Sequence, residues 1–312
     1  MFRNPRFVGI LGCAAALALV GCATNGSTTP TTGSTMPAQA GAKHLIHYMP
    51  TRYATRTRTV GPRDDTYYSG YMFTYYGGPV LLNPKVYVIF WGYKTYGDPD
   101  KVAPLLKAYA KVIGGSSHNN IYTQYYDIVS SQKNYITNPK GERGGIWFDD
   151  KNPVPTSPND AQVAQESLNG VAKFGYDANA SYVVATPHGH NTIGFGTQFC
   201  AYHSTVYYES QLVSYTNLPY MPDAGISCGS NDIAPPKDES GTDEGVTIVA
   251  GHEYGESITD PNPDTGWYDF QHGEIGDACA WMDVQNITFG KKSYSTQPMY
   301  SNANEHCEQT YK

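Results

Sequence analysis

One segment of the chain, GVTIVAGHEYGESITDP at residues 245–261, combines a histidine with two glutamates at helical spacing. On a helix, His252 and Glu256 stand four residues apart, so both side chains project from one face about one turn apart. A histidine nitrogen and a carboxylate oxygen in that arrangement can share a Zn²⁺ ion. Glu253 lies roughly 100° round the helix from His252, where it could hold and deprotonate a metal-activated water. The segment therefore predicts a metal site with His252 and Glu256 as ligands and Glu253 as general base.

A third ligand has to come from another part of the chain, and the acidic segment GEIGDAC that follows the helix is the leading source. Either Glu274 or Asp277 could reach back to the helix, and a disulfide at Cys279 would hold the loop. Asp260, one turn beyond Glu256, is a further candidate. The expected metal ligands are therefore His252, Glu256, Glu274 and Asp277. Zn²⁺ is the expected ion, with Ca²⁺ or Mn²⁺ as alternatives because a ligand set rich in oxygen suits harder cations.

Other interpretations of the same residue types stay open. An H-E-x-x-E helix can be a plain surface helix whose histidine and acids need no metal. His188 and His190 follow a predicted strand as H-x-H, which in extended chain puts both rings on one side, so they could chelate an ion or line a cleft. His203 follows Cys200 closely and is expected to pack beside a disulfide, with a substrate or metal contact as the alternative. The remaining histidines carry no spacing signal: His44, His47, His118, His272 and His306.

The elements that would position these residues form an alternating pattern of strands and helices. The dense β-branched and aromatic run at 85–91 predicts a buried strand, and the apolar run at 181–186 predicts another. Between them, Asp98 and Ser157, each followed by proline, begin two predicted helices whose apolar residues recur at helical spacing. This order predicts an α/β fold, with α+β as the alternative, in a single large domain at residues 71–312.

The composition limits the classes of function. The chain has 312 residues, of which 16% are charged, and 21 Lys and Arg against 28 Asp and Glu give a net charge of −7. An acidic chain argues against nucleic-acid binding. A hydrophobic fraction of 40% argues against disorder. The sequence has no G-x-S-x-G nucleophile motif, no P-loop and no Rossmann glycine motif, so the H-E-x-x-E segment carries the densest chemical signal.

The amino-terminal residues indicate the compartment. Residues 1–21 carry two arginines before an apolar run that is too short for a membrane span and fits a secretory signal. The LVGC that ends at Cys22 resembles a bacterial lipobox, which implies cleavage before this cysteine and its diacylation; ordinary signal cleavage is the alternative. The lipobox implies a lipid-anchored protein of the cell envelope, at the outer membrane or the cell surface. Residues 22–70 are expected to form a flexible tether.

The cysteines predict disulfides once Cys13 in the signal and Cys22 at the anchor are set aside. The others are Cys200, Cys228, Cys279 and Cys307. An even number in an oxidising compartment predicts two bridges with three possible connectivities. The more local pairing, Cys200 with Cys228 and Cys279 with Cys307, is favoured. A four-cysteine metal site is the rival, but no C-x-x-C spacing supports it.

Several segments in order resemble the Exordium-like, or phosphate-induced, protein family, and above all its bacterial secreted members. They are GGPV at 77–80, VYVI at 86–89, CAYH at 200–203, HEYGESITDPNPDTGWYD at 252–269 and EIGDACAW at 274–281. The match covers about residues 75–310. The resemblance implies a secreted or surface protein of one domain. It indicates where the protein is located rather than which reaction it catalyses.

A looser similarity, through the H-E-x-x-E helix and the strand–helix order before it, is to the zincin metalloproteases. It implies a zincin-like mixed sheet with an active-site helix, in which His252 and Glu256 are ligands and Glu253 is the general base. The chain departs from the H-E-x-x-H pattern because Glu256 stands in the place of the second histidine. Asn262 stands where a metzincin has its third histidine.

Three function classes follow. The first is a lipid-anchored, extracytoplasmic, zincin-like metallopeptidase or metallohydrolase acting on a peptide or on a cell-wall or surface polymer. The second is a non-catalytic cell-surface protein that keeps a structural metal site. The third is a glycan-binding or glycan-hydrolysing protein in which Glu253 and Glu274 act as an acid–base pair. The expected partners are the substrate and, through the lipid anchor, the membrane, with no nucleic acid.

Overall fold

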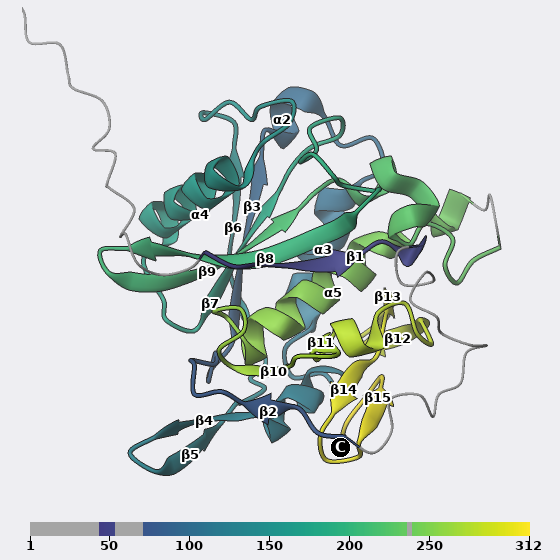
Figure 1. The fold of residues 1–312 in the computed structure, drawn as a ribbon. Helices are drawn as coiled ribbons and strands as arrows, with labels where there is room; N and C mark the ends of the chain where they lie inside the picture. Colours follow the sequence, from purple (N-terminus) through teal and green to yellow (C-terminus); the bar gives the residue numbers. More distant parts are fainter. Residues whose placement is uncertain (1–43, 54–70, 236–238) are drawn as a thin grey trace, which may run out of the picture. The chain divides into compact units, whose positions relative to one another are not determined.

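The computed structural model describes residues 44–53, 71–235 and 239–312 (Figure 1). The expected signal peptide at 1–21, the lipidation of Cys22 and most of the tether lie outside these residues. Within the described part of the chain, no helix has the length and apolar character needed to cross a membrane.

A six-stranded mixed sheet forms the centre of the fold. Its strands in spatial order are β1 (Ile46–Pro50), β8 (Phe199–Tyr208), β9 (Gln211–Leu218), β7 (Ala180–Ala185), β3 (Lys85–Trp91) and β6 (Arg143–Asp149). β3 pairs in parallel with β6 and β7, and β7 pairs in parallel with β9. β8 runs antiparallel to both β9 and β1. The predicted α/β fold is confirmed as a single domain with a mixed sheet and helices.

Helices cover both faces of this sheet because alternate side chains of a strand point to opposite faces. On β3, Val88 and Phe90 belong to the core that includes α3 (Val102–Val112) and α5 (Glu244–Thr259). Ile89 and Trp91 pack on the opposite face in the cluster that includes α4 (Asp160–Phe174). The helix that carries the H-E-x-x-E segment, α5, thus lies directly on the sheet (Figure 1).

The predicted helix starts are displaced by a few residues: Asp98 still caps α3, whereas Asn159, and not Ser157, caps α4. The Asp98 carboxylate accepts hydrogen bonds from the backbone N–H groups of Val102 at 2.8 Å and Ala103 at 2.9 Å, so α3 begins after Asp98-Pro99. α4 begins after Asn159, whose side chain forms a reciprocal capping box with Gln162.

Smaller elements surround the main sheet. A three-stranded sheet contains β2 (Thr74–Tyr75), β10 (Trp267–Asp269) and β11 (Gly273–Glu274). The hairpins are β4 (Tyr126–Val129) with β5 (Gln132–Tyr135), β12 (Gln285–Phe289) with β13 (Lys292–Thr296), and β14 (Met299–Ser301) with β15 (His306–Glu308). The short helices are α2 (Tyr93–Tyr96), η1 (Asn119–Gln124), η2 (Met221–Cys228), η3 (Glu239–Gly241) and η4 (Asp277–Cys279).

The edge strand β1 departs from the sequence analysis, which places residues 22–70 in a flexible tether. Ile46–Pro50 instead pair antiparallel with β8, with His47 opposite His203. The tether prediction does not hold for these residues, because an exposed sheet edge can recruit a short strand through main-chain hydrogen bonds alone. This strand contacts α5.

Both disulfides follow the local pairing. Cys200 on β8 is joined to Cys228 on η2, and Cys279 on η4 is joined to Cys307 on β15, with Cα–Cα distances of 5.5 and 5.7 Å. The second bridge ties the segment after β11 to the last hairpin. Two disulfides indicate a domain that folds outside the cytoplasm.

Candidate metal centre

The helix α5 is buried along its whole length, although it carries several ionisable side chains. All of its residues from Glu244 to Thr259 are buried, among them His252, Glu253 and Glu256. It contacts β8, β9, α3 and β13. A helix covered on every side is normally apolar all round. Since a buried charge is costly unless it is paired or binds a metal, these three side chains require specific partners.

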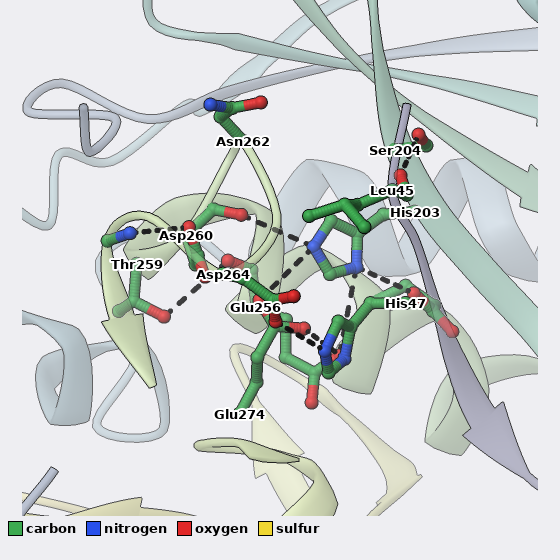
Figure 2. A network of polar contacts seen from close by, with 12 residues as sticks. Leu45, His47, His203, Ser204, Glu256, Thr259, Asp260, Asn262, Asp264 and Glu274 are labelled. Carbon is green, nitrogen blue, oxygen red and sulfur yellow. Dashed lines mark hydrogen bonds and ion pairs between the residues drawn. The ribbon is translucent and has the colours of Figure 1, made fainter. Parts of the chain in front are cut away.

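The partners come from four other elements that close around α5: β1, β8, β11 and η4. Figure 2 shows His47 of β1, His203 of β8, Glu256 of α5 and Glu274 of β11 turned toward one another. Asp277, the first residue of η4, lies beside Glu274 and His47. Because these elements are distant in sequence, the cluster exists only in the folded chain.

The first group of potential ligands comprises His252, Glu256 and Asp277. His252 Nε2 lies 3.1 Å from Glu256 Oε2 and 3.6 Å from Asp277 Oδ1. One donor atom from each residue falls within 4.8 Å of the others. Among the described residues, none of these three atoms has a hydrogen-bond partner. These three potential ligand atoms converge inside the protein and make no hydrogen bonds with one another. They therefore form a site that could hold a metal ion.

The spacing of these atoms fits ligands around one ion. Ligands about 2.1 Å from a metal are separated from each other by roughly 3.0 Å in an octahedron and roughly 3.4 Å in a tetrahedron. The 3.1 and 3.6 Å separations lie close to both values. The donor set of one nitrogen and two oxygens suits Zn²⁺ or Mn²⁺.

The backbone of the segment after β11 orients Glu256. The backbone N–H of Asp277 donates to Glu256 Oε1 at 2.9 Å, which leaves Oε2 directed at His252. Gly276 passes so close to α5 that a Cβ there would lie 2.8 Å from Glu256 Oε1 and 3.0 Å from His252 Nδ1. Gln297 holds the same turn by donating to the Gly276 carbonyl at 2.9 Å. Glycine at 276 is therefore a condition for this ligand arrangement.

The second group surrounds His203, which is itself fully buried. Its Nδ1 makes a hydrogen bond of 3.2 Å with Glu253 Oε2, and its Nε2 lies 3.3 Å from the backbone carbonyl oxygen of Asp260. A carbonyl oxygen only accepts, so Nε2 carries a proton. This ring fixes one oxygen of Glu253, while the other oxygen, Oε1, is buried without a hydrogen-bond partner among the described residues.

The third group is built by His47 of β1. Its Nδ1 lies 2.9 Å from Glu274 Oε2 and 3.4 Å from Asp277 Oδ2. Its Nε2 is 3.1 Å from Asp264 Oδ1. Glu274 is fully buried, and its other oxygen, Oε1, lies 3.4 Å from His203 Nε2. This is the more open side of the cluster, because the side chain of His47 is 20% exposed.

Burial and mutual pairing shift the pKa values in the cluster. Burial raises the pKa of Glu256 to about 8, although His252 lowers it. Burial lowers the pKa of His252, but Glu256 and the other nearby carboxylates outweigh this effect and raise it to about 9. Burial would raise the pKa of Glu274, but His203 and His47 hold it well below its usual range.

Burial and nearby carboxylates also shift the pKa values of the other two histidines, His203 and His47. Burial lowers the pKa values of His203 and His47, and Glu274 leads the carboxylates that raise both above the usual range. Within the described residues, the ion-pair partners of Glu253, Glu256 and Glu274 are all histidines. The cluster therefore contains no permanent cation to balance its carboxylates.

No family model, curated protein or solved structure matches the chain. The geometry of the cluster thus carries the functional argument. Its buried histidines and carboxylates could hold a metal ion.

The structure distributes the expected ligands over two groups. His252, Glu256 and Asp277 come together, whereas Glu274 faces His47 and His203. Because β11 pairs with β10 in a register that local spacing does not reveal, the direction of Glu274 was not predictable.

Two other candidates have different partners from those expected. The Asp260 carboxylate accepts hydrogen bonds from the backbone N–H of Gly266 at 2.7 Å and of Thr265 at 3.2 Å. The ring of His188 bonds to Asp223 at 2.5 Å, so the H-x-H segment is separate from the three groups around α5.

Two residues of the centre are not among the expected ligands. For His203 the sequence favours packing beside a disulfide, with a metal or substrate contact as the alternative, and His47 carries no spacing signal. In the structure both reach the centre through the pairing of β1 with β8, in which they stand opposite each other. An isolated histidine on a short edge strand gives no sequence signal of this role.

Proposed function

We propose that the protein is a lipid-anchored, extracytoplasmic metallohydrolase of a zincin-like kind, with peptide bonds as the expected substrate class. The observation that carries the proposal is the convergence of His252 Nε2, Glu256 Oε2 and Asp277 Oδ1, three buried donor atoms without hydrogen-bond partners in the described chain. Unsatisfied buried polar atoms are rare in native proteins, and an ion would satisfy all three at once.

The residues around this group fit the parts of a hydrolytic site. A divalent ion bound there would polarise a carbonyl group and lower the pKa of a water molecule. Glu253 follows His252 on α5, and its free oxygen can accept the proton of the attacking water. His203 holds the other Glu253 oxygen at 3.2 Å and thereby fixes the direction of the base. The third ligand, Asp277, is tied in place by the Cys279–Cys307 disulfide.

A structural metal site in a non-catalytic surface protein is the second candidate, and the depth of burial favours it. His252, Glu253 and Glu256 are fully buried, so a substrate would have to approach from the side of His47 and Asp277. The resemblance to the secreted Exordium-like proteins is compatible with this candidate. In both cases the lipobox at Cys22 would anchor the domain in the cell envelope.

Elemental analysis and substrate turnover separate these candidates. We expect the purified protein to retain at least one divalent ion per chain, to lose it in His252→Ala, and to hydrolyse casein until a chelator is added. Glu253→Gln should keep the ion and abolish turnover, whereas Glu209→Gln, in the exposed turn between β8 and β9, should change neither.

Two other results would exclude the hydrolase. A retained ion without turnover, together with a fall in melting temperature on chelation, would establish the structural role instead. A folded protein that binds no ion would refute both candidates.

A further inference from the structure

We infer that the centre holds two divalent ions, the second bound by His47, Glu274 and Asp277 and bridged to the first through the Asp277 carboxylate. This inference rests on the first ion of the proposed function. In this arrangement His47 of the edge strand β1 is a metal ligand. Glu274 binds the second ion and not the ion held by His252.

Asp277 is placed to bridge because its two oxygens face different histidines. Oδ1 lies 3.6 Å from His252 Nε2, whereas Oδ2 lies 3.4 Å from His47 Nδ1. The backbone N–H of Glu274 donates a long hydrogen bond of 3.4 Å to Oδ2, which leaves that oxygen a free lone pair. A carboxylate shared in this way is compatible with ions about 3.5–4 Å apart, the usual separation in two-metal hydrolytic sites.

Glu274 supplies the independent evidence for a ligand. Its side chain is fully buried, and neither of its oxygens makes a hydrogen bond to a described residue. Oε2 nevertheless lies 2.9 Å from His47 Nδ1, close to the separation of roughly 3.0 Å expected for two ligands of one octahedral ion. A metal ligand is deprotonated, so on ion binding the lone pairs of His47 Nδ1 and Glu274 Oε2 would point at a common cation.

The other nitrogen of His47 has the partner that a metal-binding histidine usually has. Nε2 lies 3.1 Å from Asp264 Oδ1 and can donate its proton there, so that Nδ1 presents its lone pair to Glu274 and Asp277. Such carboxylate–histidine–metal arrangements fix the tautomer and the direction of the ring. In the group around His203, by contrast, Nδ1 is already hydrogen bonded to Glu253, so that ring is a poorer ligand.

The charge of the centre also calls for more than one divalent ion. Five carboxylates make contacts in it: Glu253, Glu256, Asp264, Glu274 and Asp277. Among the described residues, their ion-pair partners are all histidines. One divalent ion can balance two carboxylates, and a second ion can balance two more. Buried carboxylates without such compensation are strongly unfavourable.

Metal stoichiometry tests the pair directly. We expect elemental analysis of the zinc-loaded protein to give two ions per chain for the wild type and one for His47→Ala. The matched control is His44→Ala, which removes a histidine next to the same strand whose ring contacts Asp160 rather than the centre. This control should keep two ions.

A second measurement covers the case in which His47→Ala fails to fold. Wild-type protein loaded with two equivalents of Mn²⁺ should give the electron paramagnetic resonance spectrum of an exchange-coupled pair. Glu274→Gln, which keeps the shape of the side chain, should give the spectrum of isolated Mn²⁺.

The outcomes separate this inference from the proposed function. One ion in the wild type, lost in His252→Ala and kept in His47→Ala, would overturn the pair and leave the first site standing. Uncoupled Mn²⁺ in the wild type would also overturn the pair. No ion in any variant would remove the proposed function together with it.

Discussion

Replacing Gly276 with alanine would test whether the close approach of its segment to α5 sets the position of the metal donors. The backbone of Gly276 has φ −84° and ψ −39°, which alanine adopts without strain. A Cβ there would lie 2.8 Å from Glu256 Oε1, 3.0 Å from His252 Nδ1 and 3.1 Å from His252 Cε1. All three atoms belong to proposed ligands, so the added methyl group must displace the ligands themselves.

The magnitude follows from these contacts. Ordinary contacts of a Cβ begin at 3.4 Å, so the segment and the helix have to separate by roughly 0.5 Å. About 0.5 Å is also the tolerance within which binding groups have to be held. Changes next to first ligands typically cost about 10–100-fold in metal affinity, or about 1.4–2.7 kcal/mol. We expect a loss of this size for Zn²⁺ in Gly276→Ala, measured by competition with a chromophoric chelator at neutral pH.

Gly251→Ala is the matched control. It also adds a methyl group to the α5 region, but its Cβ would meet the Tyr109 hydroxyl of α3 at 2.6 Å, away from the donors. We expect its zinc affinity to stay within about twofold of the wild type, whatever its melting temperature. A folded Gly276→Ala protein that binds zinc as tightly as the wild type would refute the argument that this glycine positions the ligands.

Two further predictions concern stability. Burial raises the pKa of Glu142 to about 8, against hydrogen bonds from Tyr254 and Asn119 that lower it. The folded chain therefore keeps a proton that the unfolded chain releases at lower pH, so the free energy of unfolding should fall by a few kcal/mol between about pH 5 and pH 8. Urea titrations of Glu142→Gln should show a smaller fall, and an unchanged pH dependence would contradict this account. The two disulfides have the same sequence separation of 28 residues, so replacing either pair with serines should cost about 3.5 kcal/mol of stability. Only loss of the Cys279–Cys307 bridge, which anchors η4, should also weaken zinc binding; equal weakening by both changes would argue against that anchoring role.

The parts of the fold with dense local signals were predictable from the sequence. The strand at 85–91 has the predicted bounds because its apolar run is unbroken. α5 follows from its apolar start and from the spacing of His252 and Glu256, and Asp277 was among the acids expected to meet them.

The unpredicted parts depend on pairing between distant segments. β1 joins the sheet through its main chain, so neither its short sequence nor the spacing of His47 marks it as a strand of the domain. The direction of Glu274 depends likewise on the register of β10 with β11. Side-chain periodicity carries no information about which strand edges will meet.

The donors of the centre are far apart along the chain, since His47 and Asp277 stand 230 positions from each other. A fragment that keeps α5 but ends before β11 would therefore retain the H-E-x-x-E helix and lose two carboxylates of the centre. Binding of the proposed ions would then be a late event in folding, possible only after the ends of the domain have met. Once bound, an ion present at about 100 times its dissociation constant would add about 2.7 kcal/mol to the stability of the whole domain. Chelation should accordingly lower the barrier to unfolding the protein as one cooperative unit, rather than loosen a single loop.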